Sequence, residues 1–254
     1  SDSIKSSYDE FSKQFKLNGS INFLNDLKQS GEITGKNGEM TLVHTLMIEE
    51  FSYKPNDFEV DLSPKRILFA GLGNSQKLNS EVMRECCANV IKKVSSLSIT
   101  DFSVVIEQSK IGMNKSVKSI SEGFELGNYS FDEFKTSKNK SITLNAELLI
   151  NEVKDEYLIE LEKSKITSQA SIKARNLVNR PPNVVNPEYL KDFSVDIANQ
   201  NEKLEIEIFD KNKLSELGMR AFLGVAQGSK ADPYGIKLMH KGDPENEDNN
   251  VWLI

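Results

Sequence analysis

Two glycine-rich segments contain residue types that could bind a phosphate group. Gly71-Leu72-Gly73 follows an apolar, strand-like run and precedes a helical pattern, which is the context of a dinucleotide-binding loop. Gln76 stands where the Gly-x-Gly-x-x-Gly pattern needs its third glycine, so we interpret this segment as an ordinary strand-to-helix turn. Residues 224–230 resemble a phosphate loop in composition, but their spacing differs from that of a P-loop, and we reject phosphate binding there.

Few residues could serve nucleophilic or redox catalysis. The two histidines, His44 and His240, lie in strand-like segments, and no Gly-x-Ser-x-Gly motif occurs. We therefore expect both imidazoles to be hydrogen-bonded structural groups. Cys86 and Cys87 are neighbours in a predicted helix, where adjacent side chains point apart, so we expect neither a disulfide between them nor redox catalysis. The small number of cysteines fits a reducing compartment, and we predict a cytoplasmic protein.

The sequence shows none of the usual metal-binding motifs. It has no His-Glu-x-x-His motif and no paired cysteine clusters, the common patterns of zinc sites. The segment 243–248 carries four carboxylates but lacks the regular spacing and the turn glycine of a calcium loop, so we interpret it as a solvated hairpin. Motifs therefore assign no catalytic, metal-binding or cofactor-binding residue in this chain.

The charge balance excludes some classes of partner. Lys and Arg number 32 and Asp and Glu 38, which gives a net charge of −6. Because nucleic-acid affinity rests on clustered positive charge, we do not expect a nucleic-acid partner. No apolar run is long enough to span a bilayer, and the first residues lack the apolar core of a signal peptide, so we expect no membrane partner.

The first half of the sequence alternates between strand and helix patterns. We predict strands at residues 41–48, 65–70, 102–107 and 141–150. A helix is expected to begin at about Ser80, and a short helix capped by Ser20 is expected to end at Gly31. This alternation predicts a largely parallel sheet that is covered on both faces.

A second organisation begins near residue 155. A long helix is predicted to stop before Pro181, with one apolar face that includes Ile166, Ala170 and Val178. Asn186-Pro187 is expected to start the next helix. We then predict a strand at 204–208, a short helix ending at Gly218, and strands at 235–240 and 251–254.

Several segments together resemble one known family. Residues 174–183 (ARNLVNRPPN) and 186–190 (NPEYL) resemble the domain junction of the cytosolic leucyl aminopeptidases, the M17 family. Residues 217–219 and 221–229 (LGM and AFLGVAQGS) resemble the family's next block in the same order and spacing. Supporting segments occur earlier in the chain at residues 35–39, 67–73, 122–124, 126–127 and 129. The resemblance covers nearly the whole chain.

The resemblance implies a fold and an activity. It implies an α/β fold with a macrodomain-like N-terminal domain at residues 1–154, a linking helix and Pro-Pro junction at 155–182, and the start of an α/β catalytic domain at 183–254. Members of the family assemble as hexamers and hydrolyse N-terminal residues from peptides. They use two divalent metal ions (zinc, manganese or magnesium) that activate a water molecule, and their ligands are lysine, aspartate and glutamate.

The sequence lacks the two motifs that carry the metal ligands of the family. The family's first metal-binding segment, Gly-Lys-Gly-x-x-Phe-Asp, would begin after Ile254, and its Asn-Thr-Asp-Ala-Glu-Gly-Arg block would follow later. Neither occurs in these 254 residues, so no catalytic or metal-binding residue of the family can be carried over. We expect this chain alone to bind no metal and to be inactive. The apolar end at residues 251–254 leads us to expect a fragment boundary there.

One alternative function belongs to a different class. A macrodomain-like N-terminal half could act as a stand-alone binding or oligomerisation module without catalysis. In that case, an ADP-ribose-type ligand would place its phosphates near the Gly71-Leu72-Gly73 turn. Similarity of fold alone does not establish such a site.

Overall fold

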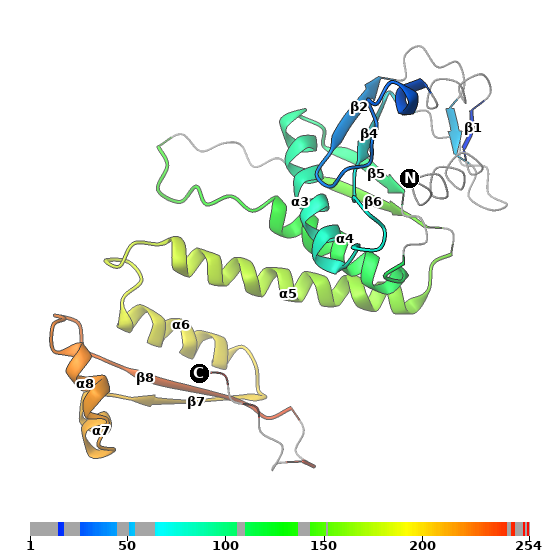
Figure 1. Ribbon diagram of the computed structural model, residues 1–254. Coiled ribbons are helices and arrows are strands. Elements are labelled where there is room, and N and C mark those ends of the chain that lie inside the picture. Colours follow the sequence, from blue (N-terminus) through cyan, green and yellow to red (C-terminus); the bar gives the residue numbers. More distant parts are fainter. Residues whose placement is uncertain are drawn as a thin grey trace. The chain divides into compact units, whose positions relative to one another are not determined.

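The structure is a computed structural model that forms two compact units, Ser1–Ala174 and Arg175–Ile254 (Figure 1). Each unit is described by itself. The domain boundaries after residues 154 and 182 remain predictions. The residues that the structure describes are 15–17, 26–44, 51–53, 64–105, 110–136, 143–150, 152–242, 245–246, 251 and 253.

The described part of the first unit contains three strand pairs and three long helices, besides a short helical segment at residues 26–29. Its strands are β1 (Phe15–Leu17), β2 (Met40–His44), β3 (Phe51–Tyr53), β4 (Arg66–Ala70), β5 (Asp101–Val105) and β6 (Asn145–Leu149). Its helices include α3 (Ser80–Ser96), α4 (Met113–Gly127) and most of α5 (Asp155–Asn179). The second unit contains α6 (Pro187–Asn199), β7 (Leu204–Phe209), α7 (Lys211–Glu216), α8 (Arg220–Ala226) and β8 (Gly235–His240). The mixed α/β fold expected from the sequence is confirmed.

Most of the described strand pairs are antiparallel. Only β5 and β6 pair in parallel, with α4 between them in the sequence as a crossover. β1 pairs with β3, β2 with β4 and β7 with β8 in antiparallel fashion. The prediction of a largely parallel sheet is therefore wrong for the described ladders. The last residue of β2 lies opposite the first residue of β4, and the last residue of β7 lies opposite the first residue of β8. In each pair, the segment that connects the two strands therefore begins and ends at the same end of the ladder.

The predicted helix starts are confirmed by their caps. The Asn79 side chain accepts hydrogen bonds from the backbone N–H groups of Glu81 and Val82 and begins α3. The Asn186 side chain accepts from the N–H of Tyr189, and a proline follows it as the first residue of α6. In both cases a short polar side chain satisfies N–H groups that have no partner within the helix. The long helix α5 ends at Asn179, ahead of the two prolines.

Other predicted elements differ at their ends. The strands predicted at 41–48 and 102–107 cover residues 40–44 and 101–105, while 45–48 and 106–107 lie outside the described residues. Residues 26–29 are helical and Gly31 has a φ of 80°, but Ser20 lies outside the described residues. Of the strand predicted at 251–254, Val251 and Leu253 are described and neither is in a strand. Only residues 245–246 of the acidic segment are described.

α5 does not bury the apolar face that its sequence suggests. Ile166 is 66% exposed, whereas Ser164 and Ser168 are fully buried. Tyr157, two helical turns before Ser164, is 9% exposed. Small side chains let two helices approach closely, and the Ser164 hydroxyl donates to the backbone carbonyl of Leu161 at 2.6 Å. The hydrophobic pattern identified the helix correctly, but its buried face consists of Tyr157 and the small polar residues Ser164 and Ser168.

The hydrophobic core of the first unit lies around α3 and α4. Met83, Cys87, Val117, Ile120 and Tyr157 form a buried cluster, which joins these two helices to the start of α5. Val104 and Leu148 of the parallel β5–β6 pair are partly buried and pack against it. In the second unit, the buried residues among those described are Ala198, Leu214 and Pro233. None of the described helices has both the length and the apolarity that crossing a membrane requires.

Candidate functional site

The Gly71-Leu72-Gly73 turn packs against the loop at residues 34–39. The backbone N–H of Gly71 donates to the carbonyl of Glu39, and that of Gly73 donates to the carbonyl of Gly35, both at 2.9 Å. A Cβ atom on Gly71 would lie 2.0 Å from the carbonyl oxygen of Lys36, so only glycine fits there. Because these two N–H groups already have protein partners, they are not available to a phosphate group.

The Glu39 carboxylate organises the same loop. It accepts hydrogen bonds from the Thr34 N–H at 2.9 Å, the Thr34 hydroxyl at 2.7 Å and the Lys36 N–H at 3.0 Å. The bond from the Thr34 N–H contributes most to holding the pKa of Glu39 below its ordinary value, because these donors stabilise the charged form. Two segments that resemble the M17 family, 35–39 and 67–73, thus form one folded feature.

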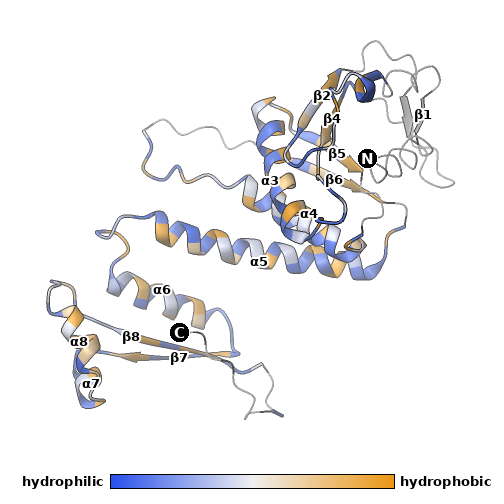
Figure 2. Ribbon diagram, in the orientation of Figure 1, coloured by the Kyte–Doolittle hydropathy of each residue, from blue (hydrophilic) through white to orange (hydrophobic). Residues whose placement is uncertain are grey.

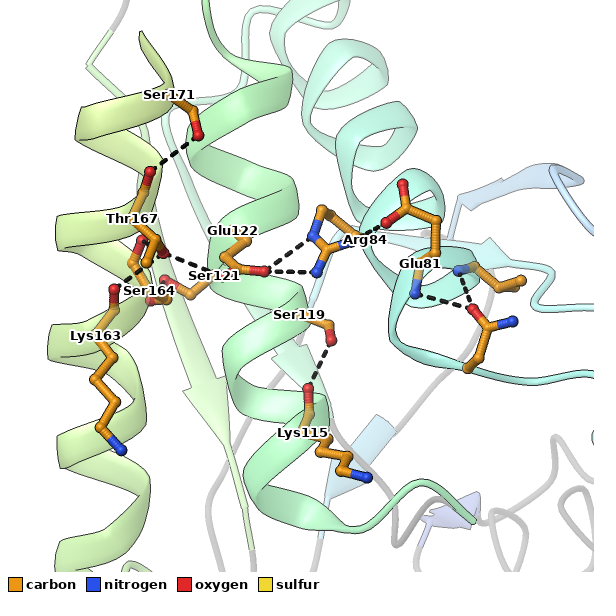
Figure 3. Close-up of polar contacts among 12 residues, drawn as sticks. Glu81, Arg84, Lys115, Ser119, Ser121, Glu122, Lys163, Ser164, Thr167 and Ser171 are labelled. Atoms are coloured by element: carbon orange, nitrogen blue, oxygen red, sulfur yellow. Dashed lines mark hydrogen bonds and ion pairs between the residues drawn. The ribbon is translucent and has the colours of Figure 1, made fainter. Parts of the chain in front are cut away.

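A polar cluster connects three helices of the first unit (Figure 3). The Glu122 carboxylate on α4 accepts from Nε of Arg84 on α3 at 2.9 Å and lies 2.8 Å from Arg84 Nη2. Its second oxygen accepts from the Thr167 hydroxyl on α5 at 3.1 Å. One helical turn away, the hydroxyl oxygens of Ser164 and Ser121 lie 2.7 Å apart, within hydrogen-bond distance. Glu122 is 7% exposed, so its charge depends on these partners for stabilisation.

Two glycines let α3 and α4 pack closely around this cluster. A Cβ atom on Gly123 would lie 2.5 Å from the Arg84 carbonyl oxygen and 2.7 Å from Cβ of Cys87. A Cβ atom on Gly127 would lie 2.6 Å from Cα of Ala88. Both contacts are shorter than a side chain can make, so glycine is required at the two positions where the helices touch. Residues 122–124 and 126–127 therefore have structural roles that explain their pattern.

The cysteine thiols are buried in the same region. Cys86 and Cys87 are free thiols, 3% and 7% exposed. Burial, with a smaller effect of the adjacent Cys86 thiol, raises the pKa of Cys87 to about 12, and burial also raises the pKa of Cys86. A thiol with a raised pKa carries almost no thiolate at neutral pH and is a poor nucleophile.

The two histidines belong to different units. His44 ends β2 in the first unit, opposite Arg66, and His240 ends β8 in the second, opposite Leu204. Both are exposed. The hydrogen bonding of their imidazoles remains a prediction.

The implied pair of metal ions does not fit the described residues. Among them, no group of three or more His, Cys, Asp and Glu side chains could hold a metal ion. Gly224, the start of the segment with phosphate-loop composition, lies within α8. In the described part of the chain, the M17-like segments at 35–39, 67–73 and 122–127 make the structural contacts given above.

The junction segment of the second unit forms a compact turn before α6. The N–H groups of Val184 and Val185 donate to the carbonyl of Pro181 at 2.9 and 3.0 Å. Arg180 donates from Nη1 to the Tyr189 hydroxyl, and its guanidinium lies 5.7 Å from the centre of the Tyr189 ring. Two residues of the M17-like pattern thus close this turn. Sequence reasoning missed this pairing and the role of Glu122, although both lie in segments that it singled out.

Two family models match the chain in sequence order. Residues 9–138 match the N-terminal domain of the cytosol aminopeptidase family, and residues 172–254 match the catalytic domain of the same family. A probable cytosol aminopeptidase of Alkaliphilus oremlandii is 30% identical over 247 residues, which are 93% of this chain and 45% of that protein. One of Aquifex aeolicus is 34% identical over 215 residues, covering 84% of this chain and 40% of that protein.

Solved structures show a similar fold. A mutant of tomato leucine aminopeptidase has a TM-score of 0.71 at 22% identity, over 88% of this chain and 42% of that one. The bottromycin maturation enzyme BotP has a TM-score of 0.65 at 18% identity, over 84% of this chain and 42% of that one. The chain spans somewhat less than half the length of the curated relatives it matches. With both domain models matched in order, the chain belongs to the cytosol aminopeptidase family, M17.

Proposed function

We propose that these residues form the N-terminal domain, the linking helix and the first part of the catalytic domain of a leucyl-type metallo-aminopeptidase. The match of residues 172–254 to the catalytic-domain model carries this proposal, because it extends the similarity past the N-terminal domain. The enzyme would hydrolyse N-terminal residues from peptides, act as a homohexamer and reside in the cytoplasm. Relatives named cytosol aminopeptidase support the reaction class.

Two divalent metal ions would supply the chemistry, by making a bound water nucleophilic near neutral pH and by polarising the scissile carbonyl. A structure of BotP, which has a similar fold, in complex with Mn supports the use of a divalent metal ion. The described residues offer no metal-binding cluster, so we assign no ligand and no catalytic step to them. We therefore propose that the 254-residue chain by itself is inactive and that its residues support the fold of the enzyme.

The native protein tests this proposal. An antibody raised against the 254-residue chain is used to capture the native product, whose intact mass and hydrolysis of leucine p-nitroanilide are then measured. We expect a mass roughly twice 28.6 kDa, together with activity that a chelator removes and added Mn²⁺ restores. The purified 254-residue chain is the control and should stay inactive in Mn²⁺. A captured protein of 28.6 kDa without activity would refute the proposal.

The alternative of a stand-alone module that binds an ADP-ribose-type ligand gains no support from the glycine turn. The N–H groups of Gly71 and Gly73 are bonded to the carbonyls of Glu39 and Gly35. A calorimetric titration of the chain with ADP-ribose would distinguish the two functions. Heat that saturates at one equivalent of ADP-ribose would favour the stand-alone binding module. A titration without heat would favour the aminopeptidase proposal.

A further inference from the structure

The second unit exposes an apolar surface around α8. It is formed by Leu217, Met219, Phe222 and Val225, which are 53%, 42%, 41% and 87% exposed. We refer to these four side chains as the α8 surface. After Arg220 at its start, α8 has no charged residue, and none of its residues is buried. Figure 2 shows hydrophobic residues along this helix.

This exposure is unusual for such a helix. A helix that is apolar on all sides is normally buried, and a contiguous apolar surface on a soluble protein commonly marks an interaction site. α8 is only seven residues long, and isolated helices shorter than about 12 residues are marginal in water. Its stability must therefore come from packing, yet α7 is the element that it contacts most. The surface is suited to a large apolar partner.

The rest of the second unit also buries few apolar residues and exposes others. Among its described residues, the buried ones are Ala198, Leu214 and Pro233. On β8, Ile236 and Leu238 are 36% and 44% exposed and lie opposite residues of β7 in the ladder. Exposed apolar residues on both a helix and a strand of one small unit are typical of a domain core cut in half, rather than of a local docking patch.

We propose that the α8 surface is an internal packing surface, covered by further catalytic-domain polypeptide that lies outside these 254 residues. This inference rests on the proposed function. The occupant is chosen because residues 172–254 match a catalytic-domain model and the chain covers 45% of the Alkaliphilus oremlandii relative. The absence of charge on α8 beyond Arg220 suits a hydrophobic layer of the same domain.

Thiol labelling reads the burial of this surface directly. Val225→Cys places a thiol at an 87% exposed position, where the substitution removes no packing in the 254-residue chain. The native Cys86 and Cys87 are buried and give little background. Lys92→Cys, at an exposed position on α3, is the matched control. The rate of alkylation by iodoacetamide is measured in the 254-residue chain and in the protein expressed from the complete native gene, whose aminopeptidase activity is assayed in parallel.

We expect the Val225→Cys thiol to react at least about 100-fold more slowly in the native-length protein, while the Lys92→Cys thiol reacts equally in both. Equal rates at position 225 in a native-length protein that retains activity would overturn the surface assignment and leave the proposed function standing. A rate in the 254-residue chain that falls as its concentration rises would also overturn it, because a second copy would then be the occupant. A native gene product of 28.6 kDa would refute both proposals together.

Discussion

Replacing Glu122 by alanine should destabilise the first unit, because this carboxylate joins three helices. It accepts from Arg84 on α3 and from Thr167 on α5, and it is 7% exposed on α4. The substitution removes the charged acceptor and leaves the Arg84 guanidinium without its most buried partner. Arg84 still pairs with Glu81, whose side chain is 62% exposed.

The expected magnitude follows from these contacts. A hydrogen bond to a charged group contributes about 1.5–3 kcal/mol, and loss of one partner of a fully buried pair costs about 3–5 kcal/mol. The Arg84 side chain keeps 27% exposure, so water and Glu81 can compensate for part of the loss. We therefore expect Glu122→Ala to lower the free energy of unfolding by about 2–3 kcal/mol. For a unit of this size, that corresponds to a fall in Tm of about 4–12 °C.

Urea unfolding followed by circular dichroism, together with scanning calorimetry, measures this loss. Glu81→Ala is the control, because it removes the other carboxylate paired with Arg84 from an exposed position, where such pairs contribute about 0–1 kcal/mol. A double-mutant cycle between Glu122→Ala and Thr167→Ala should give a coupling energy of at least about 0.5 kcal/mol.

The reasoning about the polar cluster is refuted by a small effect. If Glu122→Ala costs no more than Glu81→Ala, the Glu122 carboxylate does not stabilise the packing of the three helices. If Glu122→Ala has a large effect but shows no coupling to Thr167→Ala, the bond from Glu122 to Arg84 stabilises the unit and the bond to Thr167 on α5 does not.

Three further predictions concern the first unit. Gly123→Ala should destabilise it by about 1–3 kcal/mol in urea, because the new methyl group would overlap Cys87; an unchanged stability would contradict the close approach of α3 and α4. The pKa of Glu39 is lowered from 4.5 in the folded state, so its contribution is complete above that pH and is lost as pH falls through the lowered pKa. Glu39→Gln should cost about 1 kcal/mol at pH 7, and in a pH series of urea midpoints this difference should shrink in acid; a constant difference would contradict the bonds from Thr34. Cys86 and Cys87 should resist Ellman's reagent at pH 8 and react once urea unfolds the chain, and rapid reaction in the native state would show that they are not buried.

The sequence predicted the elements whose signals are local. Asn79 and Asn186 cap α3 and α6 because a short polar side chain can reach N–H groups two or three residues away, which requires no distant contact. The end of α5 before Pro181 has the same local origin. Strand positions were predicted well for β7 and β8, whose alternating residues share one face of a ladder.

The pairing of the strands could not be predicted in this way. The direction of a ladder depends on which strands meet and on where their connection returns, and only the β5–β6 pair is parallel among the described ones. Hydrophobic periodicity predicted that α5 packs through the face that includes Ile166, which is instead exposed. This prediction failed because a hydrophobic pattern carries no information about the surface that the helix meets. The neighbouring helix is α4, whose Ser121 and Glu122 form hydrogen bonds with the hydroxyls of Ser164 and Thr167 on α5.

The sequence by itself determined the family, the capped helices and the apolar runs, because each is recorded in short stretches of residue types. The tertiary structure alone decided that Gly71 and Gly73 bond to the loop at 34–39 and that Glu122 joins Arg84 to Thr167. These contacts connect residues 32 to 45 positions apart, and their energies depend on burial and geometry. A local sequence pattern contains neither the burial nor the geometry of such a contact, because both arise only when distant segments meet.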